Sequence, residues 1–226
     1  MANHLDLEEQ EQLDQLKHFW KTWGTLISTL LIVVFGALAA WNGYQFWQNR
    51  QASQAAALFD AVDVAVQADD AARLEQAFAD IRDKYAGTMQ AGQTGLLVAK
   101  KEFEKGNIDA AQEALAWVAG NAADDAYKSI ARLRLSALLI EKKSYDEALK
   151  QLMVVFPVEF EAAVADRRGD VLILQGKAQE AVAEYSRAYK LFDRTSDYRR
   201  LIEVKLNALG MQPQVIASST PTESGK

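Results

Sequence analysis

The sequence predicts an all-α protein, in which a single N-terminal membrane-spanning helix is followed by a stack of paired helices. Three observations support this fold class. One stretch near the N-terminus, residues 22–49, contains no charged side chain. After it, apolar residues recur at helical spacing and are interrupted by short turns at a regular interval. None of the three prolines precedes Pro157, so proline does not bar the earlier part of the chain from being helical.

The uncharged stretch is long enough to cross a bilayer. Its 28 residues lie between Lys21 and Arg50, whereas a helix needs only about 20 apolar residues to cross the hydrocarbon. Aromatic residues flank the most apolar part on both sides, as is typical of rings seated at the two headgroup layers. We therefore predict a transmembrane helix over residues 22–49 that contacts membrane lipid. The residues expected to anchor it are Trp20, Trp23, Leu26, Leu30, Val34, Trp41, Tyr44 and Trp47.

Two other interpretations of this stretch are less favoured. Ala37-Leu38-Ala39 has the small residues of a signal-peptidase site, but the preceding segment is acidic rather than short and basic. The apolar run also continues past this site into aromatic residues. A buried helix of a soluble core is disfavoured because so long a run lacks any charge.

The flanking charges predict the orientation of the helix. Residues 1–21 form a short acidic segment, interpreted as a solvated tail, with a docking peptide as the alternative. Lys17 and Lys21 lie at its membrane end, whereas the other side of the helix offers only Arg50 before Arg73. Because basic residues near helix ends favour the cytoplasmic side, we predict a cytoplasmic N-terminus. The following domain would then lie outside, which in a bacterium is the periplasm.

The composition of the domain after the helix argues against several functions. From Gln51 onward there are 22 Lys and Arg against 26 Asp and Glu, without a basic stripe, so no nucleic acid is expected as a partner. The chain has no cysteine, and its only histidines, His4 and His18, precede the helix. The domain therefore lacks the residues of a Ser-His triad or of a thiolate or imidazole metal site. We predict no enzymatic activity, no cofactor and no metal.

Helical hairpins are predicted to begin directly after the anchor. Residues 51–86 should form a first pair, with Asp69 and Asp70 available to cap its second helix. Residues 86–92 break the apolar pattern and predict a loop, with helices resuming near Gln93. The glycine spacing of residues 87–95 is similar to that of a phosphate loop, but the lysine and the preceding strand are missing, so nucleotide binding is not expected.

An internal repeat follows. Similar turns at residues 106–111, 143–148 and 176–181 each open the second helix of a pair, and their alanines lie 37 and 33 residues apart. A period near 34 with one helix-turn-helix per period is the signature of the tetratricopeptide repeat. Small residues are needed where the paired helices cross at close range. Those expected at the crossings are Ala111, Ala148 and Ala181 on the second helices and Ala99, Ser136 and Gly169 on the first helices.

The middle repeat also carries predicted helix boundaries. Its second helix is expected to begin with a capping box formed by Ser144 and Glu147. It is expected to bury Val155 and Phe156 and to be stopped by Pro157.

The C-terminal end of the domain, which we place at residues 50–210, should be closed by one more helix. A pattern over residues 198–209 predicts a helix that ends at Gly210 and covers the open end of the stack. Residues 211–226 are predicted to be a disordered tail.

Stacked hairpins of this type curve so that their first helices line a concave groove, which binds segments of other proteins. Asp166 and Asp170 stand four residues apart on one helix face. We interpret them as solvated or arginine-paired carboxylates rather than as a cation site or paired catalytic acids. The residues predicted to line the groove are Ile130, Leu133, Ala137, Ile140, Asp166, Asp170 and Ile173.

Several features together are similar to one known family. They are the acidic N-terminal segment, the aromatic cluster of residues 40–49, and degenerate repeats that contain Leu133-Arg134-Leu135 and the stretch Ala-Asp-Arg-Arg-Gly-Asp at residues 165–170. In these features the chain resembles the YfgM family, the ancillary subunit of the SecYEG translocon in Gram-negative bacteria. The resemblance extends through Leu209. Residues 211–226 are an addition to the family pattern.

The resemblance implies an inner-membrane protein whose repeat domain lies in the periplasm. It implies association with SecYEG and with the membrane-anchored chaperone PpiD, among factors that receive newly exported polypeptides, and it implies no catalytic residue. We therefore expect a non-enzymatic, membrane-anchored binding module that helps to pass newly exported proteins to periplasmic chaperones. The alternative is a scaffold for another envelope complex, such as an outer-membrane insertion or cell division machine.

Overall fold

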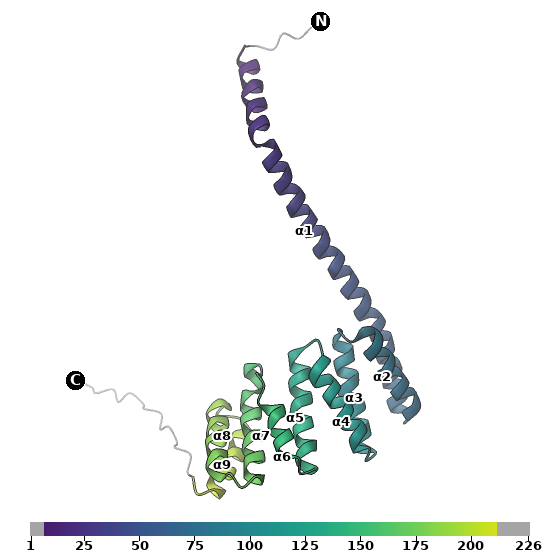
Figure 1. Ribbon diagram of the computed structural model, residues 1–226, viewed down its shortest axis with the longest axis vertical. Helices are drawn as coiled ribbons and strands as arrows, with labels where there is room; N and C mark the ends of the chain where they lie inside the picture. The colour runs from purple at the N-terminus through teal and green to yellow at the C-terminus, as the bar shows by residue number, and fades with distance from the viewer. Residues whose placement is uncertain (1–6, 212–226) are drawn as a thin grey trace, which may run out of the picture. The chain divides into compact units, whose positions relative to one another are not determined.

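The computed structural model describes residues 7–211, and in this range every regular element is a helix (Figure 1). The predicted all-α fold class is therefore confirmed. The chain divides into two units, residues 1–53 and 54–226, which are described separately. The predicted tail lies outside the described residues, apart from Met211.

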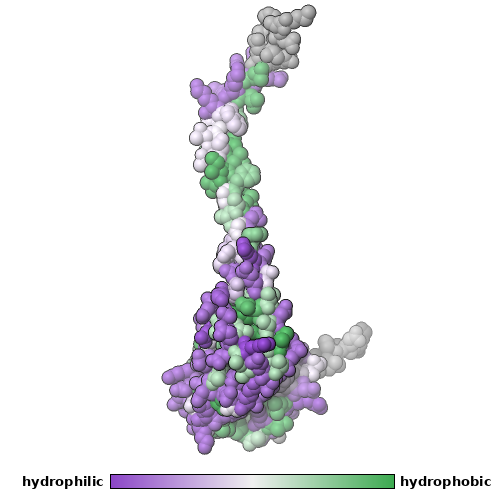
Figure 2. All heavy atoms as spheres, turned by 90° about the vertical axis from the view of Figure 1, so that its right-hand side faces the viewer, coloured by the Kyte–Doolittle hydropathy of each residue, from purple (hydrophilic) through white to green (hydrophobic). Residues whose placement is uncertain are grey.

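The first unit consists of most of α1, which runs from Leu7 to Gln67 as one continuous helix. Among the described residues, α1 is the one helix that is long and apolar enough to cross a membrane. Figure 2 shows apolar residues covering the part of this helix that lies between more polar segments. From Trp23 to Trp41 the helix rises by about 27 Å, close to the ~30 Å thickness of the hydrocarbon. Each of the eight predicted anchor residues leaves 45–62% of its surface exposed, where it can contact lipid.

Two polar side chains within the apolar part of α1 are hydrogen-bonded to the helix itself. The hydroxyl of Thr29 donates to the backbone carbonyl of Thr25 at 2.8 Å, and the amide of Asn42 donates to that of Leu38 at 3.0 Å. Because a bilayer offers no water to unpaired donors, such bonds to the carbonyl one turn earlier lower the cost of placing polar residues there.

The second unit is a succession of helix pairs, seen side by side in Figure 1. The last residues of α1, from Gln54 onward, share a core cluster with α2, so that they form the first pair. The remaining elements are α2 (Ala71–Tyr85), α3 (Met89–Glu104), α4 (Ile108–Asn121), α5 (Asp125–Glu141), α6 (Tyr145–Leu152), the 3₁₀ helix η1 (Val158–Phe160), α7 (Glu161–Leu174), α8 (Ala178–Leu191) and α9 (Asp197–Ala208).

The apolar core of this unit falls into two clusters. The larger one extends from Val62 of α1 to Val171 of α7, and the smaller one joins α7, α8 and α9 around Tyr185, Ile202 and Leu206. Leu149 of α6 packs against both clusters. Each hairpin therefore buries its apolar face mainly against its neighbours, as expected of stacked repeats.

The turn within each repeat has the same backbone form. Gly106, Lys143 and Gly176 adopt positive φ angles of 82°, 61° and 77°, and they lie at the same 37- and 33-residue spacing as the repeat alanines. The following residue donates its backbone N–H to a carbonyl five residues earlier, for example Ser144 to Leu139 at 2.9 Å. This bond defines a Schellman motif, in which glycine is preferred at the left-handed position. Lys143 adopts this left-handed conformation although its β-carbon makes the conformation less favourable than it is for glycine.

Several helix ends differ from the sequence predictions. The helix expected near Gln93 begins at Met89, because Thr88 acts as its N-cap and accepts a hydrogen bond from the backbone of Ala91. The predicted capping box at Ser144 is wrong. The backbone N–H of Ser144 donates to the carbonyl of Leu139 in the Schellman motif, so it is not available to the carboxylate of Glu147. In contrast, the predicted cap at Asp70 is confirmed, since its carboxylate accepts from the N–H of Arg73 at 3.1 Å.

The end of α6 is also different. The helix ends at Leu152, five residues before Pro157, so proline is not what stops it. Val155, which was expected to be buried, is 98% exposed, whereas Phe156 remains buried. The backbone carbonyl of Leu152 accepts two hydrogen bonds from the guanidinium of Arg168, at 3.0 and 2.6 Å. This end is therefore fixed by a residue of α7 that local pattern does not reveal.

The last described helix, α9, packs on α8 through Ile202 and Leu206, which are buried. It is followed by Gly210 at a φ of 76°, as the sequence predicts for a helix end. Its other face keeps Leu201 and Val204 exposed, at 48% and 63% of their surface. The outer face of the last described helix is therefore partly apolar, which is unusual for a helix that closes a stack.

Candidate protein-interaction surface

Small residues lie at the joints of the stack, which are the places where the two helices of a pair cross. The three repeat alanines, Ala111, Ala148 and Ala181, are completely buried, and so is Ser136 of α5. At Gly169 of α7 a β-carbon would lie 2.4 Å from Cε1 of Tyr185, so that only glycine fits beneath this ring.

One joint residue was missed from the sequence. In the α3–α4 hairpin the two helices come close at Gly95, where a β-carbon would lie 2.3 Å from Cγ2 of Val118. Ala99, which we placed at this joint, is buried one turn further along α3. Of the glycines that resembled a phosphate loop, Gly87 lies in the turn before α3, whereas Gly92 and Gly95 lie inside this helix. Gly95 permits packing against α4, and Gly92 permits packing against Tyr127 of α5.

The stretch Ala165–Asp170 holds four helices together. Besides Gly169, which receives Tyr185 of α8, it contains Arg168, which binds the end of α6 and lies 3.7 Å from Glu184 of α8. Asp166 and Asp170 both pair with Lys205 of α9, and in each case Nζ lies 2.6 Å from Oδ1. The partner of the two carboxylates is therefore this lysine, 39 and 35 residues away, rather than a neighbouring arginine.

The surroundings of this ionic cluster perturb two side chains. Burial raises the pKa of Asp166, and the nearby carboxylate of Asp170 adds to this effect even though Lys205 opposes it. Burial also raises the pKa of Tyr185, whose hydroxyl donates to Oδ1 of Asp170 at 2.8 Å. Lys205 lies 5.2 Å from the centre of the Tyr185 ring. The cluster thus joins α7, α8 and α9. The side chains of its three charged residues, Asp166, Asp170 and Lys205, each leave only 20–29% of their surface exposed.

Most of the predicted groove residues are engaged within the fold. Ile130, Leu133 and Ile140 of α5 are partly buried against the larger core cluster, and Ile173 of α7 packs against the smaller one. Asp166 and Asp170 are held by Lys205. Ala137 differs from the others, because it lines an open hollow.

This hollow lies between the first helices of two successive repeats and is called here the apolar hollow. It has a volume of about 310 Å³. Phe103 of α3, 45% exposed, Ala137 of α5 and Leu115 of α4 supply apolar surface, and Lys100, Arg134 and Glu141 supply charge at the rim. Phe103 was not predicted, although it lies one turn after Ala99 on the same side of α3. An apolar hollow with a few charged groups is suited to hold a side chain of a bound polypeptide.

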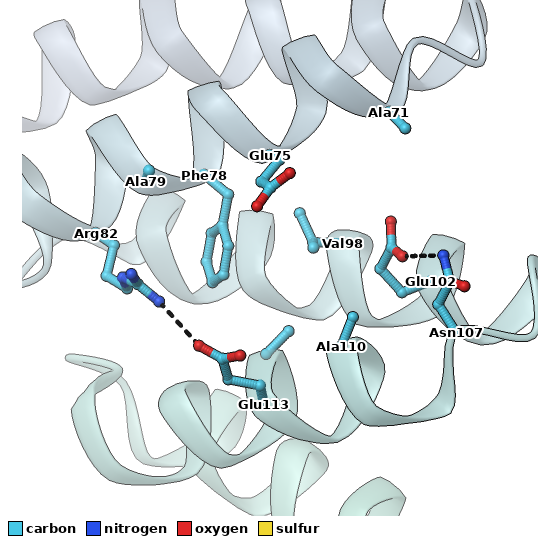
Figure 3. Close-up of a pocket in the computed structure, with 11 residues that line it drawn as sticks. Ala71, Glu75, Phe78, Ala79, Arg82, Val98, Glu102, Asn107, Ala110 and Glu113 are labelled. Atoms are coloured by element: carbon cyan, nitrogen blue, oxygen red, sulfur yellow. Dashed lines mark hydrogen bonds and ion pairs between the residues drawn. The ribbon is translucent and has the colours of Figure 1, made fainter.

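A second hollow, called here the acidic hollow, is formed by α2, α3 and α4 (Figure 3). Its volume is about 330 Å³. In Figure 3 four charged groups surround the apolar side chains of this hollow. They are the carboxylates of Glu75, Glu102 and Glu113 and the guanidinium of Arg82. The sequence analysis did not single out these residues, because they are brought together from three helices. The apolar lining residues are Ala71, Phe78, Ala79, Val98, Ala110 and Ala114.

The grouping of acidic side chains in the described part of the chain bears on whether that part can hold a metal ion. No group of three or more His, Cys, Asp or Glu within it is arranged to hold a metal ion. The two neighbouring aspartates are bound to one lysine, which accounts for them structurally. The features that stand out on this domain are therefore hollows suited to binding other molecules.

Comparison with known proteins identifies related chains of nearly the same length. The family model described as a tetratricopeptide repeat-like domain matches residues 17–211. A Neisseria gonorrhoeae protein named ancillary SecYEG translocon subunit is 34% identical, over 92% of this chain and 100% of the relative. Proteins of the same name from Haemophilus influenzae and Escherichia coli are 31% and 27% identical, over 90% of this chain and 98% and 97% of the relatives. The match includes the region of the apolar helix as well as the repeats.

Proposed function

Because this chain belongs to the tetratricopeptide repeat-like family that includes the ancillary SecYEG translocon subunits, we propose that it associates with the SecYEG translocon as a membrane-anchored, non-enzymatic binding module. The observation that carries this proposal is the 34% identity to one such subunit over that protein's whole length. The similarity covers anchor and repeats together, so it supports a common arrangement as well as a common fold. The repeats are protein-interaction modules.

The proposal includes the orientation of the anchor. With Lys17 and Lys21 on the cytoplasmic side of the inner membrane, the repeat domain from about residue 50 onward lies in the periplasm. An alkaline phosphatase fusion after Gly210 tests this, because the enzyme becomes active only after export. We expect an active fusion. An inactive one would reverse the assigned orientation.

We place the binding of newly exported polypeptides at the apolar hollow. Phe103 is exposed there and Ala137 is half-buried, and together they offer apolar surface next to the cations Lys100 and Arg134. An unfolded segment that carries an apolar side chain would gain about 1–2 kcal/mol from filling such a site, which is a weak interaction. Anchoring compensates for this weakness, since it raises the local concentration of the site near the channel from which chains emerge. A membrane-anchored chaperone of the PpiD type would receive the segment when it dissociates.

Site-specific photo-crosslinking tests this assignment in cells. A benzoylphenylalanine at Ala137 is expected to trap translocon subunits, a periplasmic chaperone or newly exported proteins. The matched control carries the same group at Glu180, an exposed position of α8 far along the chain from the hollow. Equal crosslinking at the two positions, or none at Ala137, would contradict the assignment.

Purification of the intact protein in mild detergent separates the proposal from a scaffold role in another envelope complex. Co-purification of SecYEG supports the proposal. Recovery of an outer-membrane insertion or cell division complex without the translocon would replace it.

A further inference from the structure

The acidic hollow combines two kinds of surface that together match one class of side chain. Its floor is apolar, built from the ring of Phe78 and the side chains of Val98 and Ala114. Its rim carries three carboxylates and a single arginine, Arg82. A lysine or arginine side chain has the complementary form, with an apolar stem and a charged end.

The carboxylates at the rim are not fully occupied from within the protein. Glu113 meets Arg82 only at 3.7 Å, which is longer than a good charge-assisted hydrogen bond. Glu102 accepts one hydrogen bond from the side-chain amide of Asn107, at 2.8 Å. Glu75 is exposed, and among the described residues no ion pair or hydrogen bond of its side chain is found.

Arg82 already shows how a cation is held at this place. Its guanidinium carbon lies 5.7 Å from the centre of the Phe78 ring, and one of its nitrogens faces Glu113. The side chain thus combines an aromatic contact with a carboxylate contact, which is the usual environment of a bound cation. In Figure 3 Glu75 and Arg82 lie on opposite sides of the Phe78 ring.

We propose that the acidic hollow is a second binding site, which receives a lysine or arginine side chain of a partner polypeptide between Glu75, Glu113 and Phe78. The site is separate from the apolar hollow, because it uses Val98 and Glu102 of α3 rather than Ala99 and Phe103. This site extends beyond the proposed function, since the acidic hollow would bind positively charged side chains whereas the apolar hollow would bind apolar ones. Arg82 competes with the incoming cation for Glu113.

Charge variants with opposite expected effects test this site. The probe is a fluorescein-labelled peptide of twelve residues in which every third residue is lysine and the others are alanine. The protein is the full chain in nanodiscs of phosphatidylcholine, a lipid without net charge. We expect the double variant Glu75→Gln, Glu113→Gln to weaken binding about fivefold in fluorescence anisotropy. The variant Arg82→Gln is expected to strengthen it about twofold or more, because it frees Glu113.

Matched controls separate the site from the general acidity of the domain. Glu147 and Glu180 are exposed and lie outside the hollow, so the pair Glu147→Gln, Glu180→Gln makes the same change in net charge. Arg200→Gln serves in the same way for Arg82→Gln. If the control variants shift the affinity as much as the hollow variants do, or if neither set changes it, the proposal is overturned.

Two further measurements keep the result interpretable. Circular dichroism of each variant shows whether the fold is retained. The second measurement uses Ala79→Trp, which fills the hollow without changing its charge and should abolish binding of the lysine peptide. Unchanged binding by a folded Ala79→Trp variant would refute the site. Phe103→Ser, in the apolar hollow, should leave lysine-peptide binding unchanged, so that failure of the proposed function and failure of this site are distinguishable.

Discussion

Replacement of Gly169 by alanine is expected to destabilise the C-terminal part of the repeat domain. The added β-carbon would lie 2.4, 2.6 and 2.8 Å from three ring atoms of Tyr185, whereas ordinary contacts are 3.4–4 Å. Tyr185 is only 3% exposed, so its ring has little room to move. The ring must therefore shift by about 1 Å within a packed core.

The expected size of the effect follows from opposing contributions. Alanine favours a helix interior by about 1 kcal/mol relative to glycine. Overpacking in a core costs about 1–3 kcal/mol, and displacement of the ring also weakens the hydrogen bond from Tyr185 to Asp170, worth about 1 kcal/mol. We expect a net loss of about 2 kcal/mol. For a domain of this size, that lowers the melting temperature by about 4–8 °C.

Thermal unfolding of the full chain in detergent, followed by circular dichroism, measures this effect. Gly120→Ala is the matched control, because Gly120 also lies in a helix but a β-carbon there meets no atom within 4 Å. It should leave stability unchanged or raise it by up to about 1 kcal/mol. The loss at Gly169 should largely disappear when Tyr185 is replaced by leucine. A Gly169→Ala variant that melts at or above the wild-type temperature would refute the role assigned to this contact.

Three further predictions concern the turn at Lys143 and the ionic cluster. Lys143→Gly should raise the free energy of unfolding in urea by about 0.5–1 kcal/mol, because glycine relieves the strain of a φ of 61°; a lower value would contradict this. Lys205→Met should cost about 2 kcal/mol at pH 7, since it leaves Asp166 and Asp170 as unpaired carboxylates. The loss should be smaller near pH 5, because the raised pKa of Asp166 lets this carboxyl take up a proton in the folded state before the unfolded state does; equal losses at both pH values would argue against this account. Finally, wild-type stability should fall as the pH rises above about 10, since an unfolded tyrosine loses its proton there while the raised pKa of Tyr185 keeps the folded phenol neutral. Tyr185→Phe should lose less stability between pH 9 and 11, and an identical slope would exclude Tyr185 as the source.

The long apolar helix and the repeat period could be predicted because both are local properties of the chain. The absence of charge over residues 22–49, with its apolar composition, predicts a long apolar helix. The repeat turns were found because each requires a left-handed residue and then a small one, at Gly106 and Ala111 for example, and this combination recurs. Within residues 7–211 the structure contains helices where these patterns predicted them.

The less accurate predictions concern residues whose partners are distant in sequence. The end of α6 was misplaced because it depends on Arg168, sixteen residues further along the chain. The stretch of residues 86–92 indicated a loop, although Gly92 lies within a helix, where a β-carbon would come within 3.2 Å of the Tyr127 ring. Glycine has both uses, and local pattern does not separate them.

That an apolar helix precedes a stack of paired helices can be predicted from the sequence, because hydrophobic periodicity and the spacing of turn residues are encoded over a few neighbouring positions. Which surface residues lie together is known only from the folded chain. Folding pairs Asp166 and Asp170 with Lys205, and it brings the glutamates of three helices around one hollow. Such groupings depend on how helices pack side by side, and packing joins residues that no short stretch of sequence contains.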